Sequence, residues 1–332
     1  MLVDHLVWMF VLPALRLGAP FLCFNTSLAS RMSTRIPPVF GSMTAPGVPT
    51  WATSARNLAA WVKLLAPSWF SMPLREGVRV LMLWSLGRPA GPSLRSSIES
   101  FNVKLRWCEY GLRLDAPELV ACPREFDYPQ SGRADRVYIG SCVEAGRVDA
   151  DFDWALLEEN RPLLYCSLGT YVEFYPHSRA LFEAVIGALR LREHWQGVIQ
   201  IGDKLDPGMF ESVTPRVHLV KQAPQLALLA RAKAFVTHAG LSSVREAIYH
   251  GVPMLAFPGW NDQPGNAARI EHHGLGLRGD MGTIDAKGLL TMLDRLQEPH
   301  FAKSMQRMQE TFRAQEACDA GADFIDEFLM RV

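Results

Sequence analysis

The chain lacks an excess of either charge: lysine plus arginine and aspartate plus glutamate both total 34, so the formal net charge is zero. A protein that binds nucleic acid nonspecifically needs excess positive charge, so this balance excludes that class. The six cysteines are widely spaced and form no Cys-x-x-Cys pair. This spacing argues against a zinc site or a dense disulfide framework and favours a reducing, cytoplasmic location.

Long apolar runs and a basic leader are also missing. The first apolar run, residues 6–15, follows Asp4, is interrupted by Pro13 and ends at Arg16. A secretory leader starts with basic residues, and a membrane-spanning helix needs about 20 apolar residues. We therefore expect no integral membrane segment and interpret residues 5–17 as a buried helix.

The second half of the chain alternates short apolar runs with amphipathic segments. This alternation predicts a parallel, doubly wound sheet of the α/β class. The expected strands are residues 163–167, 198–201, 217–220, 234–237 and 254–257. The expected helices are residues 177–192, 225–231, 243–249 and 286–296.

Residues 1–140 carry a less regular pattern. It predicts strands at 21–24, 119–122 and 136–139, an ordered loop at 34–53, and Trp- and Leu-rich helices at 58–65, 74–86 and 93–110. Because 332 residues exceed the usual size of one core, two domains are expected. We divide the chain into an incomplete N-terminal domain (1–140), a linker (141–161), a second domain (162–315) and a final helix (316–332).

The most informative segment begins where the strand at 234–237 ends. His238-Ala-Gly240 follows the strand and passes directly into a helix that contains Ser242, Ser243 and Glu246. Glycine permits close approach of a ligand, and a helix N-terminus offers free N–H groups and a positive dipole, so the pattern indicates an anion site. Two alternatives stay open: Ser243-Val-Arg-Glu246 fits a capping box, and His238 fits a buried core histidine.

The order of the surrounding motifs favours the anion site. In chain order they are Ser167-Leu-Gly-Thr170, Ala223-Pro-Gln225, His238-x-Gly240, Glu246, Gly251-Val-Pro253 and Pro258-x-x-x-Asp262-Gln263-x-x-Asn266. This series closely resembles the nucleotide-sugar signature of the UDP-glycosyltransferase superfamily. The resemblance implies the GT-B fold, with two Rossmann-like doubly wound domains of which the N-terminal one is incomplete.

The resemblance also implies roles for the motif residues in binding a UDP-sugar. Ala223 and Gln225 would hold the nucleobase and ribose edge, and Glu246 would accept the ribose hydroxyls. The diphosphate would be held by His238, Thr170 and the amides from Gly240 through Ser242 to Ser243. Asp262 and Gln263 would hydrogen-bond the sugar hydroxyls. Trp260 either lines the sugar pocket or serves packing.

The activity implied is inverting transfer of a sugar, with glucose expected, from a UDP-sugar to a hydroxyl of a small lipophilic acceptor. No metal or other cofactor is expected. His238 would stabilise charge on the departing diphosphate, and Asp4 matches the acid partner of the family's catalytic His–Asp pair. Asp4 alternatively caps the helix that follows it. The Trp- and Leu-rich helices before residue 110 would meet the acceptor.

Two departures from the family pattern are present. The catalytic histidine lies in the family's first βα turn, upstream of the residue that Asp4 matches, and this sequence has no such turn. Three explanations stay open: a start at an internal methionine, a partner chain that supplies the missing part, or a non-catalytic relative that binds nucleotide sugars as an auxiliary subunit. Gln222 stands where many members have a tryptophan that stacks on uracil, which leaves the preference for UDP over dTDP open.

Overall fold

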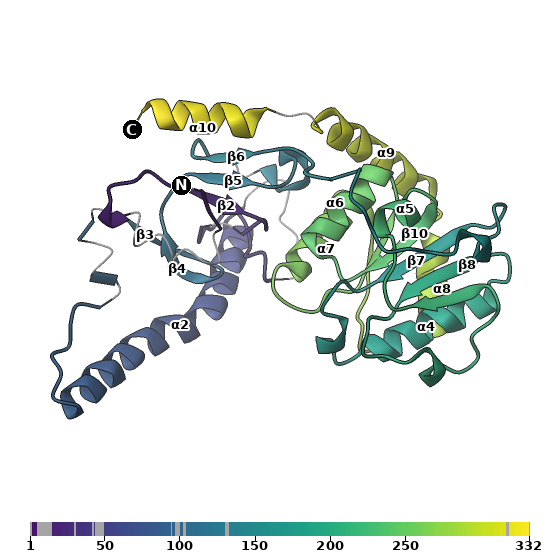
Figure 1. Ribbon diagram of the computed structural model, residues 1–332, viewed down its shortest axis with the longest axis horizontal. Helices are drawn as coiled ribbons and strands as arrows, with labels where there is room; N and C mark the ends of the chain where they lie inside the picture. The colour runs from purple at the N-terminus through teal and green to yellow at the C-terminus, as the bar shows by residue number, and fades with distance from the viewer. Residues whose placement is uncertain are drawn as a thin grey trace.

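The computed structural model of the chain describes residues 2–4, 15–29, 31–41, 43, 50–93, 95–96, 100–101, 104–129, 133–316 and 319–331. Two parallel sheets dominate these residues, one from each half of the chain (Figure 1). The N-terminal sheet has the order β1 (Leu2–Asp4), β2 (Leu22–Asn25), β5 (Glu118–Val120) and β6 (Arg136–Tyr138). The C-terminal sheet has the order β12 (Gly276–Arg278), β11 (Met254–Ala256), β10 (Ala232–Thr237), β7 (Leu163–Ser167), β8 (Gln196–Gln200) and β9 (Val217–Val220).

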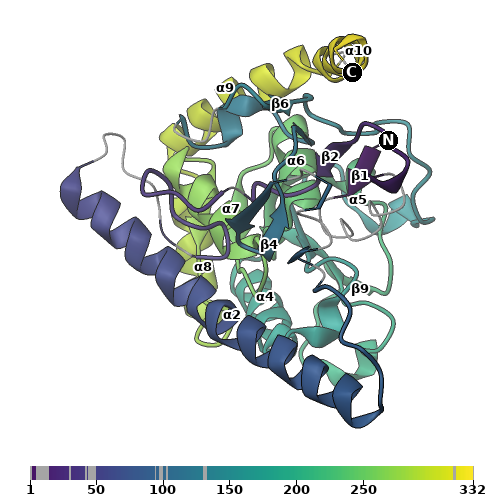
Figure 2. The same ribbon diagram turned by 90° about the vertical axis from the view of Figure 1, so that its left-hand side faces the viewer.

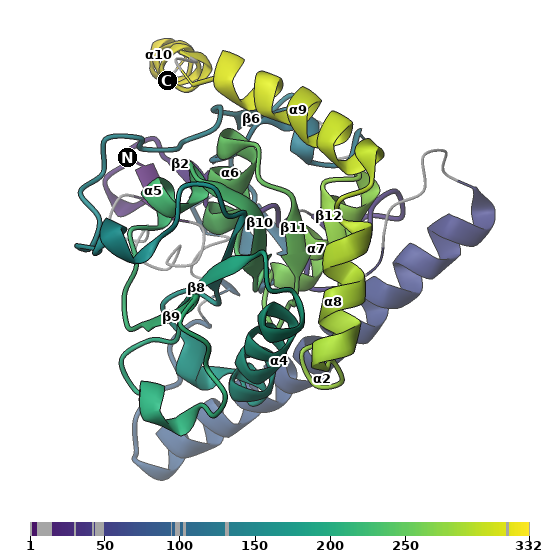
Figure 3. The ribbon, with the colours of Figure 1, turned by 90° about the vertical axis from the view of Figure 1, so that its right-hand side faces the viewer.

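Helices cover both faces of the C-terminal sheet. On one face, α4 (Ser178–Leu191) and α8 (Ala286–Arg295) pack side by side (Figure 3). The other face carries α5 (Gln225–Leu229), α6 (Leu241–His250), α7 (Gln263–His272) and α9 (Pro299–Ala314). Because successive residues of a strand point to opposite faces, Leu164 joins the core under α4 whereas Leu163 joins the core under α6. Strands buried on both faces need continuous apolar runs, which is why the sequence revealed them.

The α/β pattern predicted for the second half is therefore confirmed. The strand predicted at residues 163–167 has those bounds in the structure, and the four predicted helices correspond to α4, α5, α6 and α8. The strand at residues 276–278 was not predicted, because a three-residue strand at a sheet edge leaves little pattern.

The first half differs from the prediction at two places. Residues 51–85 form one helix, α2 (Trp51–Ser85), instead of two. Reciprocal hydrogen bonds between Thr50 and Thr53 start it, inside the segment predicted as a loop. The helix continues through Pro67 and Pro73, although proline lacks an N–H donor and usually ends a helix.

The helix predicted at residues 93–110 is wrong over its second part. A hairpin of β3 (Leu105–Cys108) and β4 (Gly111–Leu114) stands there instead. Gly111 has a φ of +87°, which glycine adopts without steric cost at the tight turn. The helix predicted for residues 5–17 lies outside the described residues, apart from residues 15–17.

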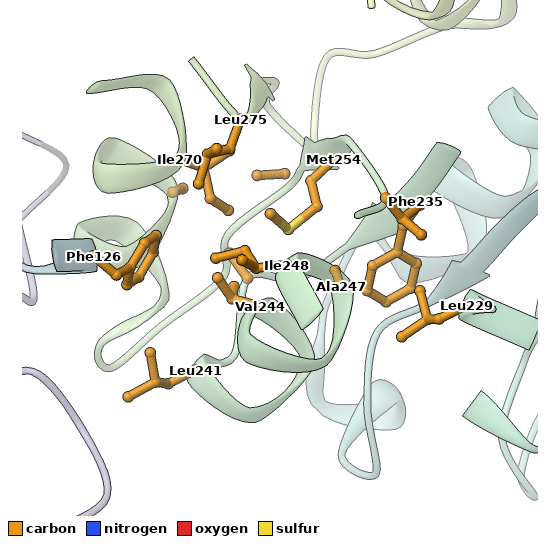
Figure 4. Packing of buried hydrophobic residues seen from close by; sticks show 14 of the residues in the cluster. Phe126, Leu229, Phe235, Leu241, Val244, Ala247, Ile248, Met254, Ile270 and Leu275 are labelled. Carbon is orange, nitrogen blue, oxygen red and sulfur yellow. The ribbon is translucent and has the colours of Figure 1, made fainter. Parts of the chain in front are cut away.

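Buried polar contacts join the two halves. Asp127 follows η2 (Arg124–Phe126) and accepts from Arg269 of α7 at 2.7 and 3.0 Å, and the Arg269 guanidinium lies 4.2 Å from the ring centre of Tyr128. His273 Nε2 lies 3.0 Å from the carbonyl oxygen of Phe126. Figure 4 shows the Phe126 ring at the edge of the core, on the side of Ile270 and Leu275.

The chain ends on the N-terminal sheet. α10 (Ala320–Met330) packs against β6, so the last segment crosses from the C-terminal to the N-terminal half (Figure 1). No helix among the described residues has the length and apolar character required to cross a membrane.

Candidate functional site

His238 lies at the carboxyl end of β10, between two glycine turns. A Cβ atom added at Gly169, which follows β7, would lie 2.8 Å from the imidazole Cε1, and one added at Gly240 would lie 2.5 Å from Nε2. Any larger residue at either position would displace the ring. Burial lowers the pKa of His238 to about 4. A hydrogen bond with the backbone of Ser167 raises the pKa, but by less than burial lowers it. The imidazole is therefore neutral at pH 7.

The turn after His238 leads into the N-terminus of α6. The N-cap residue is Gly240, and no side-chain hydrogen bond caps this helix among the described residues. The capping-box alternative for Ser243 and Glu246 is therefore wrong, because both lie inside the helix. The N–H groups of Leu241, Ser242 and Ser243 belong to the first turn, where the helix itself supplies no acceptor. Such a turn binds anions.

Glu246 is buried and belongs to a hydrogen-bond network below this turn. Its carboxylate accepts from Arg147 at 2.8 Å and from the Gln225 amide at 2.5 Å. The same Gln225 amide lies 3.3 Å from Ser243 Oγ. The structure thus brings together three predicted site residues, Gln225, Ser243 and Glu246, and adds Arg147. Each carboxylate oxygen has a second lone pair, so Glu246 can still accept from a ligand hydroxyl.

Asp262 and Gln263 lie beyond the carboxyl end of β11, at the start of α7. Burial raises the pKa of Asp262, and the Asn266 amide donates to its carboxylate at 3.1 Å. Gln263 is buried and mainly holds the loop together: its oxygen accepts from the N–H groups of Gly259 and Trp260, and its nitrogen donates to the Tyr175 hydroxyl at 2.7 Å. One N–H of this amide is left for a ligand.

Five other predicted residues lie outside this hydrogen-bond network. Thr170 and Ser242 are exposed, whereas Ala223 is half-buried against the core below α6. Trp260 is 42% exposed and lies 5.3 Å from the Tyr175 ring, so it both packs and faces solvent. Asp4 lies in the other half of the chain, at the end of β1, where its backbone pairs with Phe24.

Three residues of the site carried no sequence signal. Arg147 falls in the predicted linker, and Tyr175 and Tyr110 sit outside every motif. Tyr110 stacks edge-on with Phe40 at 4.8 Å, and the charge of Asp262 contributes to raising its pKa, after the larger effect of burial. The N-terminal half therefore faces Asp262 at this tyrosine.

A cavity of about 250 Å³ lies on the N-terminal side of Tyr110, between α2 and the β3–β4 hairpin. It is lined by Ser68, Ser71, Met72, Arg75, Arg95, Leu105, Tyr110, Gly111, Leu112 and Arg113. Apolar side chains, hydroxyl groups and guanidinium groups thus share one hollow, which reaches Tyr110. Within the described parts of the chain, no group of three or more His, Cys, Asp or Glu side chains is arranged to hold a metal ion.

The chain is similar in sequence to known proteins. The family model described as UDP-glucoronosyl and UDP-glucosyl transferase matches residues 118–331. The NDP-glycosyltransferase YjiC of Bacillus licheniformis is 30% identical over 213 residues, which cover 64% of this chain and 53% of that protein. The oleandomycin glycosyltransferase of Streptomyces antibioticus is 29% identical over 217 residues, which cover 64% and 49%. The chain thus spans about half the length of the curated relatives that it matches.

Solved structures show the same fold. The glycotransferase of kitacinnamycin superposes with a TM-score of 0.67 at 24% identity, over 98% of this chain and 75% of that one. The calicheamicin glycosyltransferase CalG4 superposes with a TM-score of 0.63 at 19% identity, over 100% and 73%. The predicted GT-B architecture is confirmed by these likenesses.

Proposed function

Because the chain belongs to the UDP-glucoronosyl and UDP-glucosyl transferase family, we propose that it acts in inverting transfer of a sugar, with glucose expected, from a UDP-sugar to a hydroxyl of a small lipophilic acceptor. The observation that carries this proposal is the position of His238, which lies between two glycine turns beside the open N-terminus of α6. Gln225 and Glu246 lie in α5 and α6, the helices before and after β10, and Asp262 and Gln263 follow the neighbouring strand β11.

The diphosphate would bind where His238 meets α6. The N–H groups of Leu241, Ser242 and Ser243, together with the helix dipole, favour an anion there. A neutral imidazole donates one hydrogen bond to a phosphate oxygen, and the negative charge that accumulates as the diphosphate leaves would raise the pKa of His238 and favour its protonation. Both effects stabilise the leaving group, so no metal is required by this proposal.

The remaining donor contacts follow from the two pairs of side chains. Glu246 would accept the ribose hydroxyls with its free lone pairs, and Ala223 and Gln225 would contact the nucleobase and ribose edge. Asp262 would accept from the sugar hydroxyls, and Gln263 would donate its remaining N–H. Thr170 would reach the diphosphate from the loop after β7.

The acceptor would enter from the N-terminal half, through the cavity beside Tyr110. In the transfer step the acceptor oxygen forms a bond to the anomeric carbon, the bond from that carbon to the diphosphate breaks, and the acceptor proton passes to a base. We propose Asp4 as the acidic partner of that base, because it ends a strand of the sheet on the acceptor side. A reducing, cytoplasmic setting is part of the proposal, because the buried side chains of Cys23, Cys108, Cys122 and Cys166 are free thiols.

Binding and turnover measurements test the donor site. We expect UDP and UDP-glucose to bind in calorimetry, and UDP release to depend on an added hydroxylated aromatic or terpenoid acceptor. His238→Ala should lower turnover by about 10²- to 10³-fold, whereas the exposed control His300→Ala should leave it unchanged. Asp262→Ala should weaken UDP-glucose binding and spare UDP binding. Tight UDP-glucose binding with no turnover on any acceptor would identify a nucleotide-sugar-binding protein instead.

A second experiment tests the acceptor cavity. Met72→Trp fills part of the 250 Å³ hollow without touching the residues that would bind the donor. We expect a raised KM for the acceptor and an unchanged dissociation constant for UDP-glucose. An unchanged acceptor KM would place the acceptor elsewhere.

A further inference from the structure

Arg147 lies in the segment between β6 and β7 and contacts the carboxylate that would bind the ribose. Its Nη1 donates to Glu246 Oε1 at 2.8 Å, and its Nε donates to Asp149 Oδ1 at 2.7 Å. Asp149 Oδ2 accepts from the N–H of Leu226, in α5, at 3.3 Å. The side chain of Gln225, the preceding residue of α5, donates to Glu246 Oε2 at 2.5 Å. These hydrogen bonds form a closed ring that joins the segment to α5 and α6, which lie side by side (Figure 2).

Both oxygens of the Glu246 carboxylate therefore have a donor from the protein itself. The Glu246 side chain is only 9% exposed, and because an arginine is not deprotonated in proteins, this carboxylate keeps a charged partner. The segment is fixed on α6 at a second place, where Arg245 donates to the carbonyl oxygens of Ser141 and Cys142 at 3.3 and 3.4 Å. The contact between Arg147 and Glu246 is thus part of the way in which the segment packs on α6.

The pairing of both carboxylate oxygens determines how strongly this site selects a ribose. A site whose buried polar groups are paired only by a substrate hydroxyl rejects the analogue without that hydroxyl by about 10⁴-fold or more, because those groups are then left unpaired. Here Glu246 keeps Arg147 and the Gln225 amide as partners when a ligand hydroxyl is missing. The ligand then loses only one further hydrogen bond to an oxygen that is already paired, which costs about tenfold in affinity or less.

We propose that Arg147 is a specificity-determining residue, which makes the donor site tolerate a sugar nucleotide that lacks the ribose 2′-hydroxyl. The donors then include sugars carried on 2′-deoxyribonucleoside diphosphates as well as UDP-sugars. This inference rests on the proposed function, because it requires that Glu246 faces the ribose of the bound donor. The segment between β6 and β7, which no sequence motif covers, thus contributes to the choice of donor.

The test is calorimetry of the full chain with UDP and with 2′-deoxy-UDP, which differ only in the 2′-hydroxyl. We expect the two dissociation constants of the parent chain to differ by less than about tenfold. Arg147→Met removes the charged donor to Glu246, so the ribose hydroxyl gains importance and the ratio of the two constants should rise by about tenfold or more. Arg147→Lys retains a charged donor and should keep the ratio of the parent chain. The control Arg161→Met alters an arginine of similar exposure in the same segment, which pairs with Glu158 instead, and should also leave the ratio unchanged.

Rejection of 2′-deoxy-UDP by the parent chain by more than about tenfold would overturn this inference and leave the proposed transfer of a sugar intact. Equal weakening of both nucleotides in Arg147→Met would also overturn it, because that is the result expected if the arginine only stabilises the fold. Binding of neither nucleotide to the parent chain would overturn the proposed function as well. If Arg147→Met fails to fold, Arg147→Gln, which keeps a polar side chain beside Asp149 but loses the charge, should still raise the ratio, and an unchanged ratio would refute the role of Arg147.

Discussion

The buried ion pair between the two halves allows a quantitative prediction. Asp127 and Arg269 side chains are 0% and 1% exposed, and Asp127 also accepts from the Tyr138 hydroxyl at 2.7 Å and lies 3.7 Å from Arg136. Burial alone would raise the pKa of Asp127, but Arg269, Arg136 and Tyr138 hold it at about 2. The carboxylate is therefore charged at neutral pH, and its partners determine what a substitution costs.

Removal of one partner leaves the other charge buried, which costs about 3 to 5 kcal/mol. Arg269→Ala leaves Asp127 with Tyr138 and Arg136, so we expect about 3 kcal/mol. Asp127→Ala leaves two fully buried guanidinium groups without that carboxylate, so we expect a loss nearer to about 5 kcal/mol. Asp127→Ala should therefore lower the free energy of unfolding more than Arg269→Ala does, because one carboxylate serves two buried guanidinium groups.

Urea unfolding followed by tryptophan fluorescence and circular dichroism measures both losses. Arg331→Ala is the control: its pair with Glu327 is 75% and 59% exposed, and exposed pairs contribute about 0.5 kcal/mol or less. A loss below about 1 kcal/mol for Arg269→Ala, or a larger loss for Arg269→Ala than for Asp127→Ala, would refute the reasoning.

Three further predictions concern pH and packing. His238 and His273 both have pKa values near 4 in the folded chain against an ordinary 6.5. Between pH 4 and pH 6.5 the unfolded state therefore binds more protons than the folded state, so the free energy of unfolding in urea should fall by about 2 kcal/mol per histidine from pH 7 to pH 5. His273→Gln should remove half of this fall. If the variant shows the whole fall, the pH dependence does not come from His273. UDP affinity measured by calorimetry should rise as the pH is lowered from 7 to 5, because the bound diphosphate raises the pKa of His238. If the affinity of His238→Ala depends on pH as strongly as that of the parent chain, the pH effect arises at another residue. Gly265→Ala should destabilise the chain by about 1 to 3 kcal/mol in urea, since its Cβ would overlap the backbone of Val39, whereas Gly77→Ala, with open space around it, should not destabilise it.

The sequence predicts an element best where the signal is local. The strand at residues 163–167 is buried on both faces and therefore continuous in its apolar character. Gln225, Ser243 and Glu246 each belong to a short motif, and the structure brings the three side chains together. Arg147 could not be found in this way, because it is 99 positions from the carboxylate that it contacts. Nothing in its local sequence distinguishes it from a solvated linker arginine.

The first half of the chain shows the opposite case, in which local signals were misleading. The Trp and Leu pattern predicted separate helices at residues 58–65 and 74–86, but one helix, α2, runs through both and through Pro67 and Pro73. Only three residues of α2 are buried, Asn57, Trp61 and Leu65, and Trp61 donates to the carbonyl of Ile36 at 2.9 Å. These contacts come from a segment 25 positions upstream of Trp61, which no periodicity within the helix can reveal.

The interface between the halves and the donor site share one helix. α7 begins at the predicted sugar-binding residues, and its last turns carry Arg269, which bonds to Asp127 of the other half. Near its start, Asn266 donates to Asp262 and to the carbonyl of Ala239, a residue held at a φ of +64° beside His238. Such a backbone conformation is unfavourable for alanine and persists only when its surroundings fix it. The helix that joins the halves through Arg269 therefore also holds, through Asn266, the turn that presents His238, so loss of Arg269 should weaken donor binding as well as stability.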